Sequence, residues 1–340
     1  MKESTKRLQG SLQQYGILGA LVVIVIDLAV GSVVAFVGGV VALLMYQMHV
    51  AWPLAVVIGL LLGILIGCWQ GFWVAYVGIP AFIVTLGGML IFRGLAIVLV
   101  EATVSGLPSG FVAIAAGSLP PFLGYAGMLD VVTLVIGIAT IAVALFSSFR
   151  RRAKDIKAGA AVIPFGLFVT GQVLIALAIA FVTYLLSLSS GGTPIVLIII
   201  GVLVVIYSFV MAKTKFGRHI YAVGGNLRAA QLSGINTKRT DFLVFVNMGF
   251  LAALAGIITT SRAGAAVATA GNNYELDAIA AAFIGGTAVS GGIGKISGAI
   301  IGALIMGVLN MGLSILAVDS AWQQSIKGLV VILAVAVDLI

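Results

Sequence analysis

Long apolar runs, separated by short polar connections, make up most of the chain. Ten runs approach or exceed the length of about 20 mostly apolar residues that an α-helix needs to cross a bilayer. They lie at 16–46, 52–77, 80–101, 127–149, 163–189, 192–212, 241–262, 274–290, 296–318 and 322–340. The pattern predicts an all-α polytopic bundle of about ten transmembrane helices, with eight as the lower bound, in a single domain over 1–340.

Two of these runs depart from the simple pattern. The run 16–46 is long and contains Asp27, which indicates a broken helix. The run 274–290 is short, and we expect it either to span or to be re-entrant.

Composition supports lipid as the solvent for most of the chain. Hydrophobic residues make up 62% of it and charged residues 8%, whereas a soluble domain carries roughly 25% charged residues. Gly59, Gly63, Gly67 and Gly71 recur every four residues. This spacing places them on one helix face, where small residues let helices cross closely.

The basic residues predict the orientation in the membrane. Most of the 18 Lys and Arg residues lie in the N-terminal segment, in 150–158, in 213–240 and at Lys295, and the ten-span pattern places all four on one side. Because cytoplasmic connections carry the excess of Lys and Arg, we expect both chain ends in the cytoplasm. The scatter of these charges over separate connections, with few aromatic residues between them, is against a nucleic-acid partner.

The sequence has no pattern typical of an enzyme site. His49 and His219 are far apart, and no Ser/His/Asp or Cys/His arrangement is present. The stretch GGIGKIS departs from a phosphate-binding loop, because Val289 stands at the first glycine position and Ile296 follows the lysine. We therefore expect this chain to bind no cofactor and any use of ATP and Mg²⁺ to belong to a partner subunit.

Four polar residues within the apolar runs are candidates for a transport path or for bridges between helices. Ionisable groups inside a membrane are costly and are functional candidates by default. Asp27 and Arg93 could pair and fix two helices, or each could reach an interface. Asn247 and Asn310 could line a polar path, although a hydrogen bond between helices is favoured.

Two acidic residues, Glu275 and Asp277, lie at the outer end of the run 274–290. They are candidates for docking a protein at the outer face or for the entrance of a path. An acidic first turn of a helix is an equally good interpretation, because carboxylates are favourable there.

The longest polar stretch, 213–240, predicts a short helix between two turns. We expect a turn at Gly224 and Gly225, a helix over Asn226–Leu232 with Asn226 as its N-cap, and an end at Gly234. Such a helix on the cytoplasmic face suits docking to a soluble partner, although a surface segment without a partner is an equally good interpretation.

This stretch resembles the cytoplasmic coupling segment of bacterial ABC-importer permeases of the monosaccharide class, in particular the xylose-type and multiple-monosaccharide group. In GRHIYAVGGNLRAAQLSGIN, Ala229, Ala230, Gly234 and Ile235 match the pattern of two alanines followed by a glycine, and Arg228 stands where Glu is usual. The stretches IDLAVGS, PAFIVTLGGMLIFRG, ELDAIAAAFIGGTAVSGGIG and GALIMGVLNMGLS resemble the same permeases in the same order. The N-terminal region is shorter than theirs, and their usual basic tail is missing.

The resemblance implies a permease subunit in a bacterial inner membrane. Two permease copies would form the path, a periplasmic binding protein would deliver a monosaccharide, and cytoplasmic ATPase subunits would receive the short helix in a groove. The resemblance assigns coupling to Gly224, Gly225, Asn226, Ala229, Ala230 and Gly234.

Two other classes of protein stay open from the sequence. An ion-coupled secondary transporter would use acidic residues and broken helices near the midplane, for which Asp27 is the one deep acid. A membrane scaffold without transport would need neither an ATPase nor an outer docking surface. Co-purification with an ATPase distinguishes the importer from both.

Overall fold

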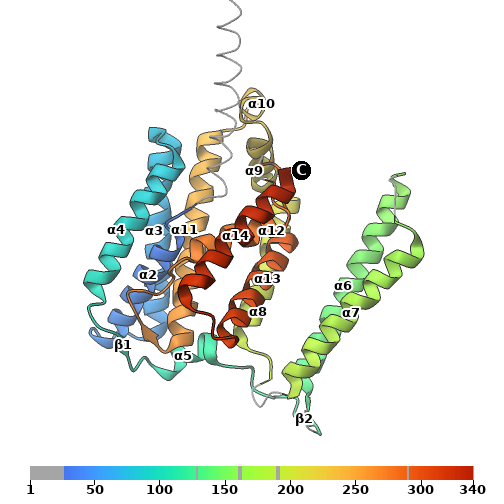
Figure 1. Ribbon diagram of the computed structural model, residues 1–340, viewed down its shortest axis with the longest axis horizontal. Helices are drawn as coiled ribbons and strands as arrows, with labels where there is room; N and C mark the ends of the chain where they lie inside the picture. Colours follow the sequence, from blue (N-terminus) through green and yellow to red (C-terminus); the bar gives the residue numbers. More distant parts are fainter. Residues whose placement is uncertain (1–26, 128, 160–162, 189–191, 289–290, 340) are drawn as a thin grey trace, which may run out of the picture. The chain divides into compact units, whose positions relative to one another are not determined.

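A computed structural model describes residues 27–339 apart from 128, 160–162, 189–191 and 289–290, and these residues form helices almost throughout (Figure 1). The helices are α2 (Val30–Tyr46), α3 (Trp52–Phe72) continued by the π-helix η1 (Trp73–Val77), α4 (Ala81–Leu99), α5 (Ser109–Ala116), α6 (Val131–Lys157), α7 (Phe165–Leu188), α8 (Ile195–Lys213), α9 (Lys215–Gly225), α10 (Leu227–Leu232), α11 (Thr237–Ala263), α12 (Tyr274–Ile284), α13 (Ile296–Ile315) and α14 (Ser320–Leu339). Two short antiparallel pairs join Val104–Ser105 to Ala265–Ala266 (β1 and β4) and Tyr125–Ala126 to Leu129–Asp130 (β2 and β3).

Seven of the described helices are long and apolar enough to cross a membrane, which agrees with a helical membrane protein. The expected run 16–46 lies partly outside the described residues, and its helix α2 begins only at Val30. Helix α12 has 11 residues, about 16 Å at 1.5 Å per residue. It is therefore too short for a bilayer core of about 30 Å, as the short run 274–290 suggests. The full number of ten spans stays a prediction.

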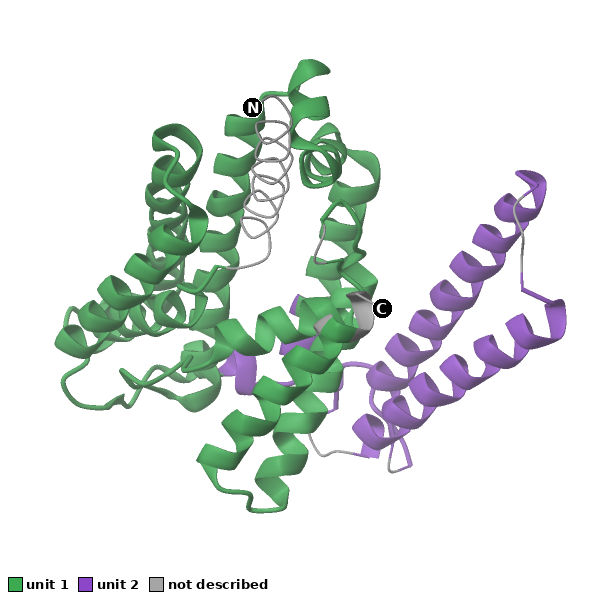
Figure 2. Cartoon of the chain, turned by 45° about the horizontal axis from the view of Figure 1, so that its top comes forward, with its two compact units in different colours: residues 1–112, 200–340 green, residues 113–199 purple. Residues whose placement is uncertain are grey.

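The described chain divides into two compact units, where the sequence predicts one permease domain (Figure 2). Unit 1 consists of the residues up to 112 and those from 200 onward. Unit 2 consists of residues 113–199, which lie between these two segments in the sequence.

In unit 1, the core is built where α2 and α3 pack against α11, and α4 packs against α2. The glycines of α3 face α11, and their missing side chains permit the contact. A Cβ atom at Gly63 would lie 2.3 Å from the Cβ atom of Ala253, and one at Gly67 would lie 2.4 Å from the carbonyl oxygen of Phe245. The four-residue glycine spacing of the sequence therefore marks a close helix crossing.

A second packed group in unit 1 consists of α12, α13 and α14. Its buried side chains are Ala280, Ala281 and Met306. The backbones of α12 and α13 approach closely, because a Cβ atom at Gly302 would lie 1.9 Å from the carbonyl oxygen of Ala281. Small residues thus hold the short helix α12 against a longer one.

Unit 2 is a hairpin of the long helices α6 and α7. Asp130 caps α6, accepting hydrogen bonds from the backbone nitrogens of Val132 and Thr133 at 3.3 and 3.0 Å. Along both helices, large apolar side chains such as Phe146 and Phe181 are exposed, as expected for helices that face lipid or another membrane subunit.

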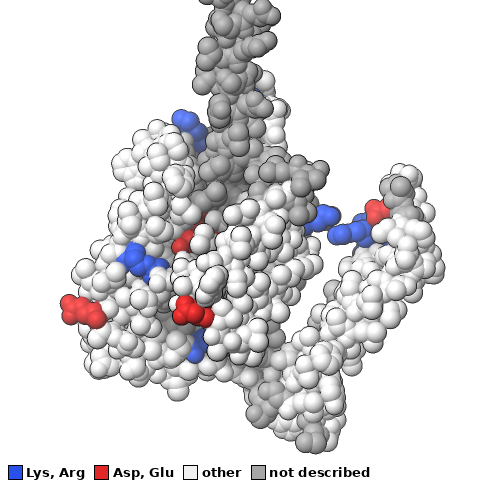
Figure 3. Space-filling view, viewed as in Figure 1, with Lys and Arg blue, Asp and Glu red and all other residues white. Residues whose placement is uncertain are grey.

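The surface of the described residues carries few charged side chains, and most of the visible face is uncharged (Figure 3). Its large exposed residues include many Leu, Ile, Val and Phe on the membrane-length helices. Water is a poor solvent for such a surface, which agrees with the low charge of the sequence.

Candidate functional site

The polar segment 213–240, which we name the coupling segment, folds as two short helices and the start of α11. Helix α9 is capped by Thr214, whose hydroxyl accepts from the backbone nitrogen of Gly217. The predicted turn at Gly224 and Gly225 is wrong, because both residues belong to the last turn of α9. The chain turns instead at Asn226, which has extended backbone angles (φ −158°, ψ 101°).

Asn226 has the capping geometry that the sequence predicts. Its Oδ1 atom accepts a hydrogen bond of 2.9 Å from the backbone nitrogen of Ala229, as N-cap side chains do. Gly234 follows the end of α10 with a φ of 81°, a left-handed conformation that glycine adopts without steric cost. The short helix α10 therefore has a defined beginning and a defined end.

The two alanines of this segment face different surroundings. Ala230 is buried, with 4% of its surface exposed, whereas Ala229 is exposed. Leu232 is 90% exposed at the end of α10. A soluble partner could therefore contact Ala229 and Leu232, while Ala230 holds the helix against the rest of unit 1.

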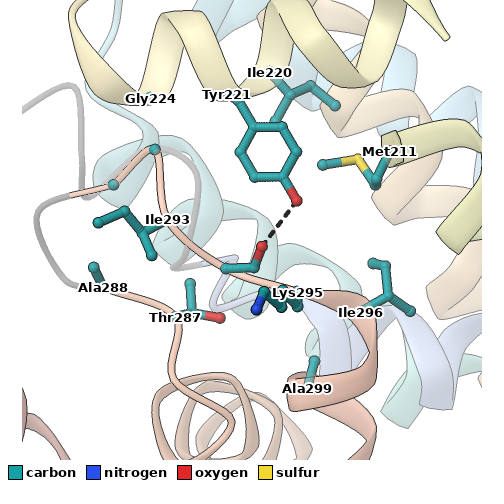
Figure 4. A pocket seen from close by; sticks show the side chains of 13 residues that line it. Met211, Ile220, Tyr221, Gly224, Thr287, Ala288, Ile293, Lys295, Ile296 and Ala299 are labelled. Carbon is teal, nitrogen blue, oxygen red and sulfur yellow. Dashed lines mark hydrogen bonds between the residues drawn. The ribbon is translucent and has the colours of Figure 1, made fainter. Parts of the chain in front are cut away.

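Helix α9 is joined to the glycine-rich residues 291–295, which precede α13. The hydroxyl of Tyr221 donates a hydrogen bond of 2.8 Å to the carbonyl oxygen of Gly294 (Figure 4). A Cβ atom at Gly292 would lie 2.8 Å from the Cα atom of Gly225, so the two backbones touch. A cavity of about 180 Å³ lies beside this contact and is lined by residues that include Met211, Ile220, Thr287 and Lys295.

This contact connects the coupling segment to helices within the membrane. Gly285, at the end of α12, packs against Gly298 of α13. A Cβ atom at Gly285 would lie 2.4 Å from the carbonyl oxygen of Gly298. Close backbone contacts therefore lead from α9 through residues 291–295 to α13, and from α13 to the end of α12.

Arg93 and Asp27 each form hydrogen bonds with backbone groups and not with each other. The Nη1 atom of Arg93 donates to the carbonyl oxygens of Ala268 and Ala270, each at 2.9 Å. Asp27 accepts from the backbone nitrogen of Ala29 at 2.8 Å. Of the two alternatives that the sequence leaves open, the ion pair is therefore not formed among the described residues. Arg93 instead provides hydrogen bonds to irregular backbone ahead of α12, which within a membrane needs such partners.

Asp277 lies in an internal polar network between α12, α13 and α14. The Nζ atom of Lys327 is 3.1 Å from each carboxylate oxygen of Asp277. Asn310 donates its Nδ2 hydrogen to the Oδ2 atom at 3.0 Å. The side chain of Asp277 is 20% exposed, so its contacts are those of a helix bridge and little of it is accessible to a docking protein.

Glu275 and Asn247 also point to neighbouring helices. The Oε2 atom of Glu275 is buried without a hydrogen-bond partner, and it would lie 2.4 Å from a Cβ atom at Gly31 of α2. Asn247 of α11 accepts a hydrogen bond from the hydroxyl of Tyr207 of α8. Asn247 and Asn310 thus both lie in bridges between helices.

The sequence alone does not single out Tyr221, Lys327, Ser32 or Gln70, although each takes part in a polar contact or is a buried polar side chain. Lys327 could have been found, because it is a cation inside an apolar run. Tyr221 carries no comparable signal, since its partner is a backbone carbonyl 73 residues away. Among the described residues, no group of three or more His, Cys, Asp or Glu could hold a metal ion.

Comparison with known families identifies the class of protein. The family described as branched-chain amino acid transport system / permease component matches residues 103–335. The chain belongs to this family. The resemblance to transport permeases that the sequence motifs indicate is thereby confirmed, and the chain is a multi-pass permease component of a transport system rather than an enzyme.

Several of the relatives that the chain matches are named as sugar permeases. The chain is 37% identical to the xylose transport system permease protein of Haemophilus influenzae, over 98% of this chain and 89% of the relative. It is 38% identical to the xylose transport system permease protein of Escherichia coli K12, over 98% and 85%. The ribose import permease protein of Escherichia coli K12 is 48% identical over 43% of this chain and 46% of the relative. No solved structure matches significantly.

Proposed function

We propose that the chain is the membrane-spanning subunit of an ATP-driven importer of xylose or a closely related monosaccharide. The observation that carries the proposal is the similarity to xylose permeases over 98% of the chain. The cytoplasmic ATPase, the periplasmic sugar-binding protein and a second permease copy are the partners that this function requires. ATP and Mg²⁺ would bind to the ATPase, because this chain has no phosphate-binding loop.

The exposed face of α10 would dock in a groove of the ATPase. Leu232 and Ala229 are its accessible apolar residues, and apolar side chains in pockets commonly dominate binding energy. Asn226 and Gly234 define the two ends of α10. Gly224 and Gly225 take part in the last turn of α9, which touches residues 291–295.

ATP-driven movement of the ATPase would then shift α10 and α9 together. The hydrogen bond from Tyr221 to Gly294 would carry this shift to α12 and α13. Alternating access of a path between two permease copies follows if these short and long helices move as rigid bodies.

Leu232→Glu in the reconstituted transporter tests this function. We expect loss of ATPase co-purification and of xylose uptake, because a carboxylate cannot be desolvated cheaply in an apolar groove. Ile156→Glu is the matched control, since Ile156 is also an exposed aliphatic residue, 55% exposed, and lies in the basic last turn of α6 in unit 2. Uptake of xylose by the wild-type complex without ATP would contradict the proposal, as would normal ATPase binding by Leu232→Glu.

A further inference from the structure

Three buried polar groups around the start of α2 have no hydrogen-bond partner in the described structure. They are the Oγ atom of Ser32 in α2, the Nε2 atom of Gln70 in α3 and the Oε2 atom of Glu275 in α12. Ser32 and Gln70 are 0% and 1% exposed. A buried polar group without a hydrogen bond costs free energy. The cost is higher in the bilayer core, because no water is present there to form the missing hydrogen bond.

These groups surround the same turn of α2. Glu275 reaches Gly31, the residue before Ser32. Gln70 reaches the contact between α2 and α4 at Gly88. A Cβ atom at Gly88 would lie 2.7 Å from the Nε2 atom of Gln70 and 3.4 Å from the Cβ atom of Ala29, the residue before α2. Arg93 of α4, anchored on the carbonyl oxygens of Ala268 and Ala270, adds a cation nearby.

The turn lies deep within the bundle. Helices α2 and α11 run in the same direction, with Val34 against Gly256 and Gly38 against Thr260. Because α11 ends at Ala263, the start of α2 lies about 15 Å from that end at 1.5 Å per residue. This depth is near the middle of an apolar core of about 30 Å.

Two short helices begin at this place. Gly271, which precedes α12, and Glu275, in the first turn of α12, contact Gly31 in the first turn of α2. Neither N-cap residue provides a side-chain hydrogen bond. The first backbone N–H groups of a helix lack partners within the helix and favour polar ligands. Helices interrupted at the midplane provide such groups to a substrate in membrane transporters.

We propose that Ser32, Gln70 and Glu275 bind the hydroxyl groups of the transported monosaccharide as it crosses the middle of the membrane. The set fits a neutral polyhydroxy compound, because the amide donates, the carboxylate accepts and the serine hydroxyl does both. The groups are packed closed in this structure, so the site opens when α2 and α4 separate around them. This inference rests on the proposed sugar-import function and assigns its substrate site.

Ser32→Ala and Gln70→Leu test the site in the complete transporter reconstituted with its ATPase and binding protein. We expect xylose uptake to fall at least severalfold, with ATPase co-purification retained. We expect the unfolding temperature to stay equal or to rise, because each change removes an unpaired buried polar group. Ser261→Ala is the matched control, since Ser261 is equally buried but donates to the carbonyl oxygen of Phe111 at 2.7 Å; its unfolding temperature should fall.

A panel of xylose and its single-deoxy analogues separates sugar binding from water binding. In Glu275→Gln and in Gln70→Leu, we expect the preference for xylose over at least one analogue to shrink severalfold, since that analogue lacks the hydroxyl that the altered group contacts. Unchanged preferences would show that the groups hold water only, and would overturn the proposal.

Two further outcomes also overturn the proposal. Unchanged uptake would show that the groups take no part in transport, and uptake and unfolding temperature falling together would show a structural role. Failure of the import function itself is distinguishable, because then the wild-type complex would not take up xylose at all.

Discussion

Single side chains fix the beginnings of α10 and α11. Asn226 begins α10 through one hydrogen bond of 2.9 Å, and Asn236 begins α11 in the same way, accepting from the backbone nitrogen of Arg239 at 3.0 Å. A helix of six residues is too short to be stable by itself, so α10 depends on its cap more than α11 does.

We expect Asn226→Ala to weaken coupling without unfolding the protein. Loss of an N-cap lowers helix stability by about 1 kcal/mol, and the helix that loses this stability is α10. Xylose uptake should drop severalfold, while Asn226→Asp should retain it, because a carboxylate caps equally well. Asn236→Ala, the matched control, should affect uptake less; equal losses in both variants would contradict this account. Uptake by reconstituted vesicles is the measurement.

Asp277 shows that the surroundings of a residue decide its role. Its sequence context fits a docking surface, the entrance of a path or the acidic first turn of a helix, and Asp277 does lie in the first turn of α12. Lys327, 50 residues further along the chain, lies 3.1 Å from its carboxylate. That contact depends on how α12 and α14 pack, which no local pattern contains.

At the scale of elements, close backbone contacts between helices organise unit 1. The α3 and α11 crossing depends on glycine, and so does the contact of α9 with residues 291–295. The first contact stabilises the bundle, whereas the second links the coupling segment to α12 and α13. The two contacts therefore lead to different predictions.

Gly67→Ala should destabilise the bundle, because the added methyl group would lie 2.4 Å from the carbonyl oxygen of Phe245. Overpacking costs typically 1–3 kcal/mol, so the unfolding temperature in detergent should fall by roughly several degrees. Gly94→Ala is the matched control in α4, where a Cβ atom would have no neighbour within 4 Å. A similar change in both variants would contradict the crossing.

Tyr221→Phe should uncouple ATP hydrolysis from transport, because it removes the hydroxyl that donates to the carbonyl oxygen of Gly294 and keeps the aromatic ring. We expect more ATP hydrolysed per xylose taken up, with the ATPase still bound. Tyr76→Phe is the control, since the described structure shows no hydrogen bond of the Tyr76 hydroxyl. An unchanged ratio of ATP to xylose in Tyr221→Phe would show that the contact does not transmit movement.

At the scale of the whole molecule, orientation in the membrane is the property that most constrains the function. The coupling segment must be cytoplasmic to meet an ATPase, and the distribution of Lys and Arg predicts this side. The predicted ten-span arrangement places residues 102–126 and the end of α13 on the opposite side.

Cysteine labelling tests this orientation in a Cys68→Ala background, because Cys68 is the one cysteine of the chain. Ile156→Cys and Leu232→Cys should react with an impermeant maleimide only after the cells are opened. Leu123→Cys and Leu316→Cys, at positions 55% and 75% exposed, should react in cells whose inner membrane is intact. Reaction of all four from one side would contradict the ten-span arrangement.

The sequence by itself determined that the chain is a helical membrane protein and where α10 begins and ends, because hydropathy, capping and glycine spacing act over a few neighbouring residues. It also determined the family, through motifs that keep their order along the chain. Only the tertiary structure decided that Ala230 is buried and Ala229 exposed, that Arg93 contacts Ala268 and Ala270 rather than Asp27, and that Ser32, Gln70 and Glu275 surround one turn of α2. These facts depend on which helices pack together and at what depth, and contacts between distant residues leave no periodic signal in a single sequence.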